Sequence, residues 1–199
     1  MSNRRQELLD AAIELVGRGG IRELTHRAVD AEAGVPAGST SNYFRTRDAL
    51  LDALVERFAE RERANWDEVT AALHPTTPKE LAQALAVAAR DSVGPHRTLT
   101  LTRYAILLEG AHRPELRTKL TEVGARVDAW FVTCLRAVGS TDPERDLPIA
   151  ANYVVGVVLH ELANPAAAFD PTDQLVTLVE SLVHGGSVHG GSVHKGRRR

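Results

Sequence analysis

Residues 34–51, GVPAGSTSNYFRTRDALL, hold the side chains whose types and spacing are best suited to recognition chemistry. A short helix over 37–43 places Thr40 and Phe44 on its inner side and leaves serine, asparagine and tyrosine on its outer side. Small hydroxyl and amide groups can hydrogen-bond to base edges in a DNA major groove about 12 Å wide. The segment is therefore typical of a surface that contacts a duplex, although Tyr43 can instead close a small helical core.

The residues before this segment predict two helices and a tight turn. Apolar residues recur at helical spacing over 4–18. Thr25 is suited to cap a second helix, which runs to Ala33 and is broken by Gly34. Two short helices joined by a turn that contains glycine, the second polar on its outer side, are typical of a helix-turn-helix.

A long fourth helix is predicted over residues 47–73, with Thr46 as its cap. Arg47 lies in its first turn, where the helix dipole disfavours a cation by roughly a few tenths of a kcal/mol. A bound phosphate offsets this cost, because the helix amides and the guanidinium attract the same anion. Arg47 is therefore a candidate phosphate contact. His26, near the start of the second helix, can either contact a phosphate or face solvent.

Composition places the chain among ordinary globular proteins. Of its 199 residues, 43% are hydrophobic and 25% are charged, and no apolar run approaches the roughly 18 residues of a membrane span. The start MSNRRQELLD has no apolar signal core, and the single cysteine, Cys134, cannot form an internal disulfide. We therefore expect a cytoplasmic protein that does not contact a membrane.

The net charge of −2 does not indicate a generally basic nucleic-acid binder. Residues 1–50 contain seven arginines and seven acidic residues. Attraction to DNA would therefore have to come from their arrangement, with cations on one face and acids on another.

Residues 75–184 form a second predicted region. Breaks at HPTTP, VGPHRT, GSTDPERDLP and NPAAAFDPTD separate five helices. These helices are expected near residues 79–93, 97–111, 114–138, 144–163 and 171–183. Because no segment shows the alternation typical of a strand, the fold class is all-α with nine helices.

Residues 185–199 repeat HGGSV and end in cations, which predicts a disordered Gly/His/Arg-rich tail. Its cations can add nonspecific attraction to DNA or have no role. Histidines spaced through a glycine-rich chain preorganise no ligand set, so no metal site is predicted.

Six side chains in the second region and at the end of the fourth helix are candidates to line an effector cavity. They are Trp66, Arg103, Tyr104, Leu107, Trp130 and Cys134. Plain core packing is the alternative for any one of them. Cys134 is interpreted as a small buried hydrophobic side chain, because a redox switch within one chain needs a second cysteine.

The last two predicted helices suit a contact between two copies of the chain. IAANYVVGVVLHELA has a small residue in the middle of one side, and LVTLVESLV is nearly apolar on two faces. Candidate interface residues are Tyr153, Gly156, His160, Leu175, Leu178 and Leu182. Two copies related by a two-fold axis can bind a palindromic DNA site.

Three motifs give residues 4–58 a specific resemblance. The motifs LLDAAIELVGRGG, LTHRAVDAEAGV and NYFRTRDALLDAL occur in an order and at a spacing that resemble the N-terminal domain of tetracycline-repressor (TetR) family transcriptional regulators. The resemblance implies a nine-helix protein with a helix-turn-helix DNA-binding domain over 1–47, connected by the helix 47–73 to an effector-binding and dimerisation domain over 75–184. It implies a homodimer that represses transcription until a small ligand binds.

The resemblance also implies residue roles. Thr25, Tyr43 and Arg47 would contact phosphates, and His26 is a further candidate. Ala37, Gly38, Ser39, Ser41 and Asn42 would face bases. The chain departs from the family pattern at Pro36, Thr40 and Ser41, where a hydroxyl cap, a leucine and a tyrosine are usual. Its recognition helix is therefore smaller and more polar than usual.

Three classes of function follow. The first is a repressor released from a palindromic operator by a small molecule of unknown class. The second is a DNA-binding regulator whose C-terminal domain serves only dimerisation or protein contacts. The third, an all-helical enzyme, is disfavoured because the chain has no G-x-S-x-G, phosphate-loop, HExxH or dinucleotide motif. No cofactor is predicted.

Overall fold

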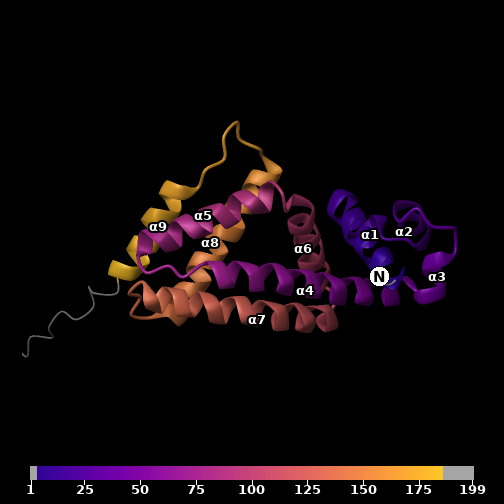
Figure 1. Ribbon diagram of the computed structural model, residues 1–199, viewed down its shortest axis with the longest axis horizontal. Coiled ribbons are helices and arrows are strands. Elements are labelled where there is room, and N and C mark those ends of the chain that lie inside the picture. Colours follow the sequence, from indigo (N-terminus) through magenta and orange to yellow (C-terminus); the bar gives the residue numbers. More distant parts are fainter. Residues whose placement is uncertain (1–3, 186–199) are drawn as a thin grey trace, which may run out of the picture. The chain divides into compact units, whose positions relative to one another are not determined.

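The computed structural model describes residues 4–185, which form α-helices joined by short connections (Figure 1). The elements are α1 (Arg4–Gly19), the 3-10 turn η1 (Ile21–Glu23), α2 (His26–Glu32), α3 (Ser39–Tyr43), α4 (Arg47–Ala72), α5 (Pro78–Val93), α6 (Arg97–Gly110), α7 (Pro114–Ala137), α8 (Pro143–Ala163) and α9 (Thr172–Gly185). Because these described residues contain nine α-helices and no strand, the all-α, nine-helix prediction is confirmed. The predicted tail beyond Gly185 lies outside them.

The predicted helix boundaries agree with the structure to within two residues. The third helix begins later than expected, at Ser39, because Gly38 adopts a left-handed backbone with φ of 91°. Within residues 4–185, no helix combines the length and apolar character needed to cross a bilayer.

The chain divides into two units, each with its own core. The first contains the residues up to Leu73 together with Arg90–Ala129, so it holds α1 to α4, α6 and the start of α7. The second contains His74–Ala89 and the residues from Trp130 onward. The domain boundaries expected from the sequence remain a prediction.

The first unit is built around the apolar face of α1, which packs against α4 and α6. Leu8, Leu9 and Ile13 are fully buried there, and each such side chain stabilises the fold by roughly 1.5–3 kcal/mol. Gly17 lies where α1 meets α6, and a Cβ on it would come within 2.4 Å of both the Thr98 methyl carbon and the Thr98 carbonyl oxygen. Only glycine allows this approach.

The second unit has a core of small and aliphatic side chains from α5, α7, α8 and α9. Cys134 is buried in it, as expected for a small hydrophobic side chain, and this burial raises the pKa of its thiol. Leu175 is also fully buried within its own chain, so its side chain cannot contact a second copy. This corrects the expectation that Leu175 lies at an interface.

Candidate nucleic-acid interface

The turn between α2 and α3 is fixed by backbone geometry. Thr25 caps α2, because its hydroxyl oxygen accepts a hydrogen bond from the Ala28 amide at 3.2 Å. At the other end of α2, Gly34 has φ of 64°, and the Val35 amide donates to the Asp30 carbonyl at 3.0 Å. This left-handed ending stops α2 after two turns and directs the chain into the next helix.

The start of α3 is held by Asp30, whose importance the sequence did not reveal. Its buried carboxylate accepts hydrogen bonds from the amides of Gly38 and Thr40, both at 2.7 Å, and from the Thr40 hydroxyl at 2.5 Å. The N-cap residue of α3 is Gly38, which has no side chain to satisfy these amides. Asp30 therefore caps α3 from the neighbouring helix.

The same contacts set the charge state of Asp30. Burial by itself raises the pKa of this carboxyl, but the hydrogen bonds from Thr40 and Gly38 and the nearby His26 outweigh that effect. The pKa is therefore lowered from its ordinary value of 3.8. Asp30 is an ionised acceptor at neutral pH, and charged acceptors make the stronger hydrogen bonds.

The outer side of α3 and of the turn before it is exposed, as the sequence predicted. The exposed residues are Ala37, Gly38, Ser41, Asn42 and Tyr43. Ser39 is partly exposed and its hydroxyl donates to the Pro36 carbonyl. Thr40 and Phe44 are buried, and Tyr43 is 48% exposed, so its ring does not close the core. The structure thus gathers small polar groups and one phenol on a single surface.

Arg47 and His26 make contacts within the protein that the sequence did not predict. The Arg47 Nε donates to the Leu24 carbonyl at 3.0 Å and its Nη2 donates to the Ile21 carbonyl at 2.7 Å. The His26 Nε2 lies 2.7 Å from the Phe44 carbonyl, which can only accept, so this nitrogen carries the proton. These bonds use donors that we expected to reach a phosphate, and they fix α2, η1 and α3 relative to α4.

Of the seven acidic residues in 1–50, five are paired with arginines. Ion pairs join Glu7 to Arg4, Asp10 to Arg57, Glu14 to Arg61, Glu32 to Arg18 and Asp48 to Arg113. By contrast, Arg27 and Arg45 are exposed and form no ion pair with another described residue. The arrangement therefore leaves unpaired cations on either side of α3 in the sequence, which the bulk charge did not indicate.

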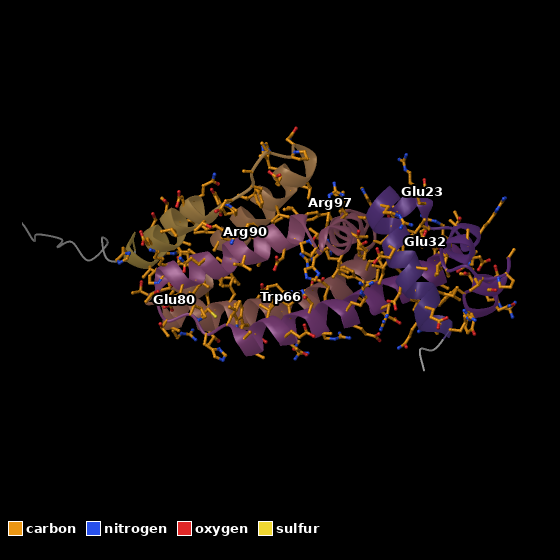
Figure 2. The ribbon with its side chains drawn as sticks, turned by 45° about the horizontal axis from the view of Figure 1, so that its top comes forward. Glu23, Glu32, Trp66, Glu80, Arg90 and Arg97 are labelled. Carbon is orange, nitrogen blue, oxygen red and sulfur yellow. The ribbon has the colours of Figure 1, made fainter. Side chains whose placement is uncertain are left out.

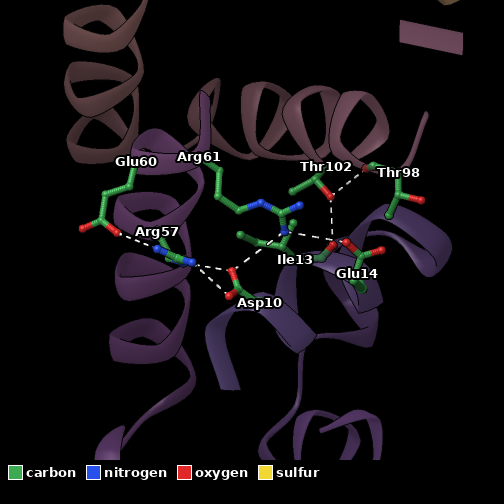
Figure 3. A network of polar contacts seen from close by, with 8 residues as sticks. All are labelled: Asp10, Ile13, Glu14, Arg57, Glu60, Arg61, Thr98 and Thr102. Atoms are coloured by element: carbon green, nitrogen blue, oxygen red, sulfur yellow. Dashed lines mark hydrogen bonds and ion pairs between the residues drawn. The ribbon is translucent and has the colours of Figure 1, made fainter. Parts of the chain in front are cut away.

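A polar network fastens α1 to both α4 and α6 (Figure 3). Arg57 on α4 binds Asp10 on α1 through two parallel bonds of 2.9 Å, and this pairing raises the pKa of the guanidinium. Thr102 on α6 donates to the Ile13 carbonyl of α1 at 2.9 Å. These bonds therefore fix the position of α1 relative to both α4 and α6.

The candidate effector residues divide between the two units. Trp66, Arg103, Tyr104 and Leu107 belong to the first unit. Arg103 pairs with buried Glu62, with Nε to Oε2 at 3.0 Å, and burial raises the pKa of Tyr104 despite the charge of Arg103. Trp130 and Cys134 belong to the second unit, where Trp130 packs against the core beside Phe131. The sequence did not single out Glu62.

The candidate interface on α8 and α9 includes a groove of about 440 Å³. Tyr153, Gly156 and His160 line it from α8, and the Tyr153 hydroxyl donates to Gln174 Oε1 at 3.0 Å. Leu178 and Leu182 are partly buried against the core of their own unit. Large apolar side chains on α8 remain exposed, namely Ile149, Val155 and Leu159.

Comparison with known proteins gives concordant matches over both regions. Residues 8–54 match the family model of bacterial regulatory proteins, tetR family, and residues 76–185 match a tetracyclin repressor-like C-terminal domain. The chain is 27% identical to the transcriptional repressor KstR of Rhodococcus jostii over 92% of this chain and 84% of KstR. It is 26% identical to the regulator BetI of Yersinia pestis over 78% and 77%.

Among solved structures, the multidrug binding protein EbrR complexed with ethidium is 30% identical to this chain. The match covers 91% of this chain and 99% of EbrR, with a TM-score of 0.66. EbrR is also known in complex with proflavin.

Proposed function

The chain belongs to the TetR family of bacterial transcriptional regulators, and we propose that it is a cytoplasmic repressor that binds a palindromic operator as a homodimer and leaves it when a small molecule binds. The observation that supports this most strongly is the surface of α3, where exposed polar side chains lie on a helix held by buried hydrogen bonds. A rigid, polar and uncrowded helix is what base recognition requires. The named relatives are regulators rather than enzymes, and we propose no catalytic role.

In the proposed complex, the outer side of α3 enters the major groove. Ser41 and Asn42 face base edges, and Asn42 is suited to bidentate hydrogen bonding with adenine, worth roughly 1–3 kcal/mol of discrimination. Ala37, Gly38 and Ser39 allow close approach of the backbone to the bases. Thr25 and Tyr43 contact phosphates at the edge of the groove.

For the phosphate contacts, we propose other arginines than the sequence pattern indicated. Arg27 and Arg45 have exposed guanidinium groups, so we assign them to phosphates. Arg47 donates to two backbone carbonyls, so we propose that it positions the helix-turn-helix. His26 acts in the same way through the Phe44 carbonyl.

Dimerisation is proposed through α8 and α9. Tyr153, Gly156 and His160 are exposed on α8, and exposed Val155 and Leu159 add apolar area that a second copy would cover. Leu178 and Leu182 would contribute only the parts of their side chains that their own unit leaves exposed. A two-fold axis through this surface pairs two α3 helices with two half-sites.

For the effector, we propose a flat aromatic cation as the class of ligand. Ethidium and proflavin, which EbrR binds, are both aromatic amines of this shape. The network from α6 and α4 to α1 supplies the coupling, since it ties the helices of the candidate effector residues to the DNA-binding helices.

Footprinting on the DNA flanking the protein's own coding region tests the function. We expect a protected site with two-fold symmetry and an affinity that falls steeply with salt. A protected site without symmetry would contradict the dimeric arrangement, and no protection would contradict the regulator itself. A thermal-shift screen followed by a DNA-release assay then separates an effector-responsive repressor from a regulator that only dimerises.

A further inference from the structure

Glu62 is a buried carboxylate on α4 with one oxygen satisfied and the other not. Its side chain is 4% exposed, and Oε2 accepts from both Nε and Nη2 of Arg103 on α6. Within the part of the chain that the structure describes, Glu62 Oε1 is the one buried side-chain oxygen or nitrogen without a hydrogen-bond partner. Leaving a buried acceptor unsatisfied destabilises the fold, and the cost is greater for a charged group. Such an atom calls for an explanation.

Arg103 already balances the negative charge of Glu62, so the partner that Oε1 lacks need not be a cation. Arg103 supplies a full positive charge through two donors on Oε2. Oε1 therefore needs a hydrogen-bond donor in its plane rather than a second counter-ion. A ligand that presents an N–H group satisfies this need, whereas a cation without N–H or O–H groups does not.

The residues beside this ion pair favour a flat aromatic ligand. Trp66 follows Glu62 by one helical turn on α4, so the two lie on the same face of that helix. Figure 2 labels the Trp66 side chain on this helix. On α6, Tyr104 is partly buried next to Arg103, and Leu107 is 46% exposed one turn further on. The Arg103 side chain is itself 31% exposed, so one side of the ion pair reaches the surface. Aromatic side chains bind flat cations through their faces.

We propose that Glu62 is an effector-binding residue, whose Oε1 accepts a hydrogen bond from an amino N–H group of a flat aromatic amine. This inference rests on the proposed function and names the acceptor within it. Because Glu62 and Arg103 join α4 to α6, and Thr102 joins α6 to α1, the bound amine acts where those helices meet.

Two dyes provide the test on the full-length protein without DNA. Proflavin and acridine orange share a cationic acridine ring, but the amino N–H groups of proflavin are replaced by N-methyl groups in acridine orange. We expect calorimetric titration of the wild type to show proflavin binding about ten- to a hundredfold more tightly, as one hydrogen bond to a charged acceptor requires. Equal binding of the two dyes, or binding of neither, would overturn the proposal.

Substitution of Glu62 should remove this preference. In Glu62→Gln the amide oxygen turns toward Arg103, which leaves an NH₂ group facing the ligand's own donors, so we expect the two dyes to bind with similar affinity. Glu56→Gln is the matched control, because Glu56 lies on the same helix but is exposed and paired with Lys119. It should keep the wild-type preference. A preference that survives in Glu62→Gln contradicts the assignment.

A second variant covers the case in which Glu62→Gln does not fold. Replacing both partners, as Glu62→Leu with Arg103→Met, removes the buried pair without leaving a lone charge, a change that proteins often tolerate. This variant should bind the two dyes equally, and a retained preference would overturn the proposal. Operator binding by the wild type is measured in parallel, so that a failure of the regulator proposal is distinguished from a failure of the Glu62 assignment.

Discussion

The α3 surface and the α8–α9 surface are stabilised in opposite ways. α3 has five residues, too few for a stable isolated helix, and hydrogen bonds hold its two ends: the Thr40 amide donates to Asp30 at the start, and His26 donates to the Phe44 carbonyl at the end. α8 has 21 residues and α9 has 14, and apolar contacts centred on Leu175 and Val179 hold them. Removing a single hydrogen-bonding group should therefore destabilise α3. On the α8–α9 surface, substitution of an exposed apolar side chain should instead change how the surface binds a second copy.

The largest effect is expected for Asp30→Ala. The change leaves two buried or partly buried amides and the Thr40 hydroxyl without their acceptor, which should lower the free energy of unfolding by roughly 3 kcal/mol and abolish specific DNA binding. Urea unfolding and anisotropy with operator DNA measure both effects. Glu32→Ala, on the same helix but paired with Arg18 at the surface, serves as the control and should change stability little.

The same carboxylate predicts a pH dependence. Because its pKa in the folded protein is lowered from 3.8, its contribution to stability is present above that value and is lost as pH falls through the lower folded pKa. Asp30→Ala should lack this component, so the difference in unfolding free energy between wild type and variant should shrink below about pH 3.8. A difference that stays constant down to pH 2 would show that the charge of Asp30 is not what stabilises α3.

On the α8–α9 surface, Leu159→Arg should weaken dimerisation while leaving the chain folded. Leu159 is 49% exposed, so the charge is tolerated in the monomer but would be buried without a partner in the proposed dimer. We expect the dimer dissociation constant to rise at least about tenfold, measured by light scattering or sedimentation. Val87→Arg is the matched control, since Val87 is equally exposed, at 48%, but lies on α5.

A smaller loss of stability is expected for Gly38→Ala. This variant tests the α3 side of the comparison, because it restricts the backbone at the turn and removes no hydrogen bond. A Cβ at this position meets no atom within 4 Å, but φ of 91° is strained for any residue with a side chain. The expected cost is about 1–2 kcal/mol in unfolding free energy. If stability is unchanged, the turn before α3 is more adaptable than its hydrogen bonds indicate.

The smallest effect on stability is expected for Arg45→Ala. This variant should reduce the slope of log affinity against log salt by roughly one unit per chain, as the loss of a phosphate contact requires. Arg47→Ala should instead lower stability, because it removes two bonds to backbone carbonyls. A reduced slope in Arg47→Ala with unchanged stability would reverse the roles that we propose for these two arginines.

Much of the fold was predictable because its signals are local. Apolar residues at helical spacing, caps such as Thr25 and Thr46, and stops such as Gly34 lie within a few residues of the boundaries that they define. The outer and inner sides of α3 followed from the same periodicity, which placed Thr40 inside and Asn42 outside.

The contacts that the sequence did not predict are side-chain hydrogen bonds between segments far apart in the chain. Asp30 binds atoms eight and ten residues away, and Arg47 donates to the carbonyls of Ile21 in the 3-10 turn and of Leu24 just after it, more than 20 residues earlier. Periodicity contains no information on such pairs. Glu62 did leave a signal, since it continues the i+4 row of Leu54 and Phe58, where an apolar residue is expected. An acid in such a buried row is itself a sequence signal of a polar partner.

Gly17 has a consequence for how motion passes through the first unit. Where α1 meets α6, the glycine backbone lies against the Thr98 methyl carbon and the Thr98 carbonyl oxygen, and Gly17 itself has no side chain that could change rotamer. Packing elsewhere can absorb a small shift by such adjustments, but here even a displacement the size of one methyl group has to move the neighbouring helix as well. The junction therefore leaves almost no room for α1 and α6 to move independently, and a single methyl group at position 17 should hold the two helices permanently apart.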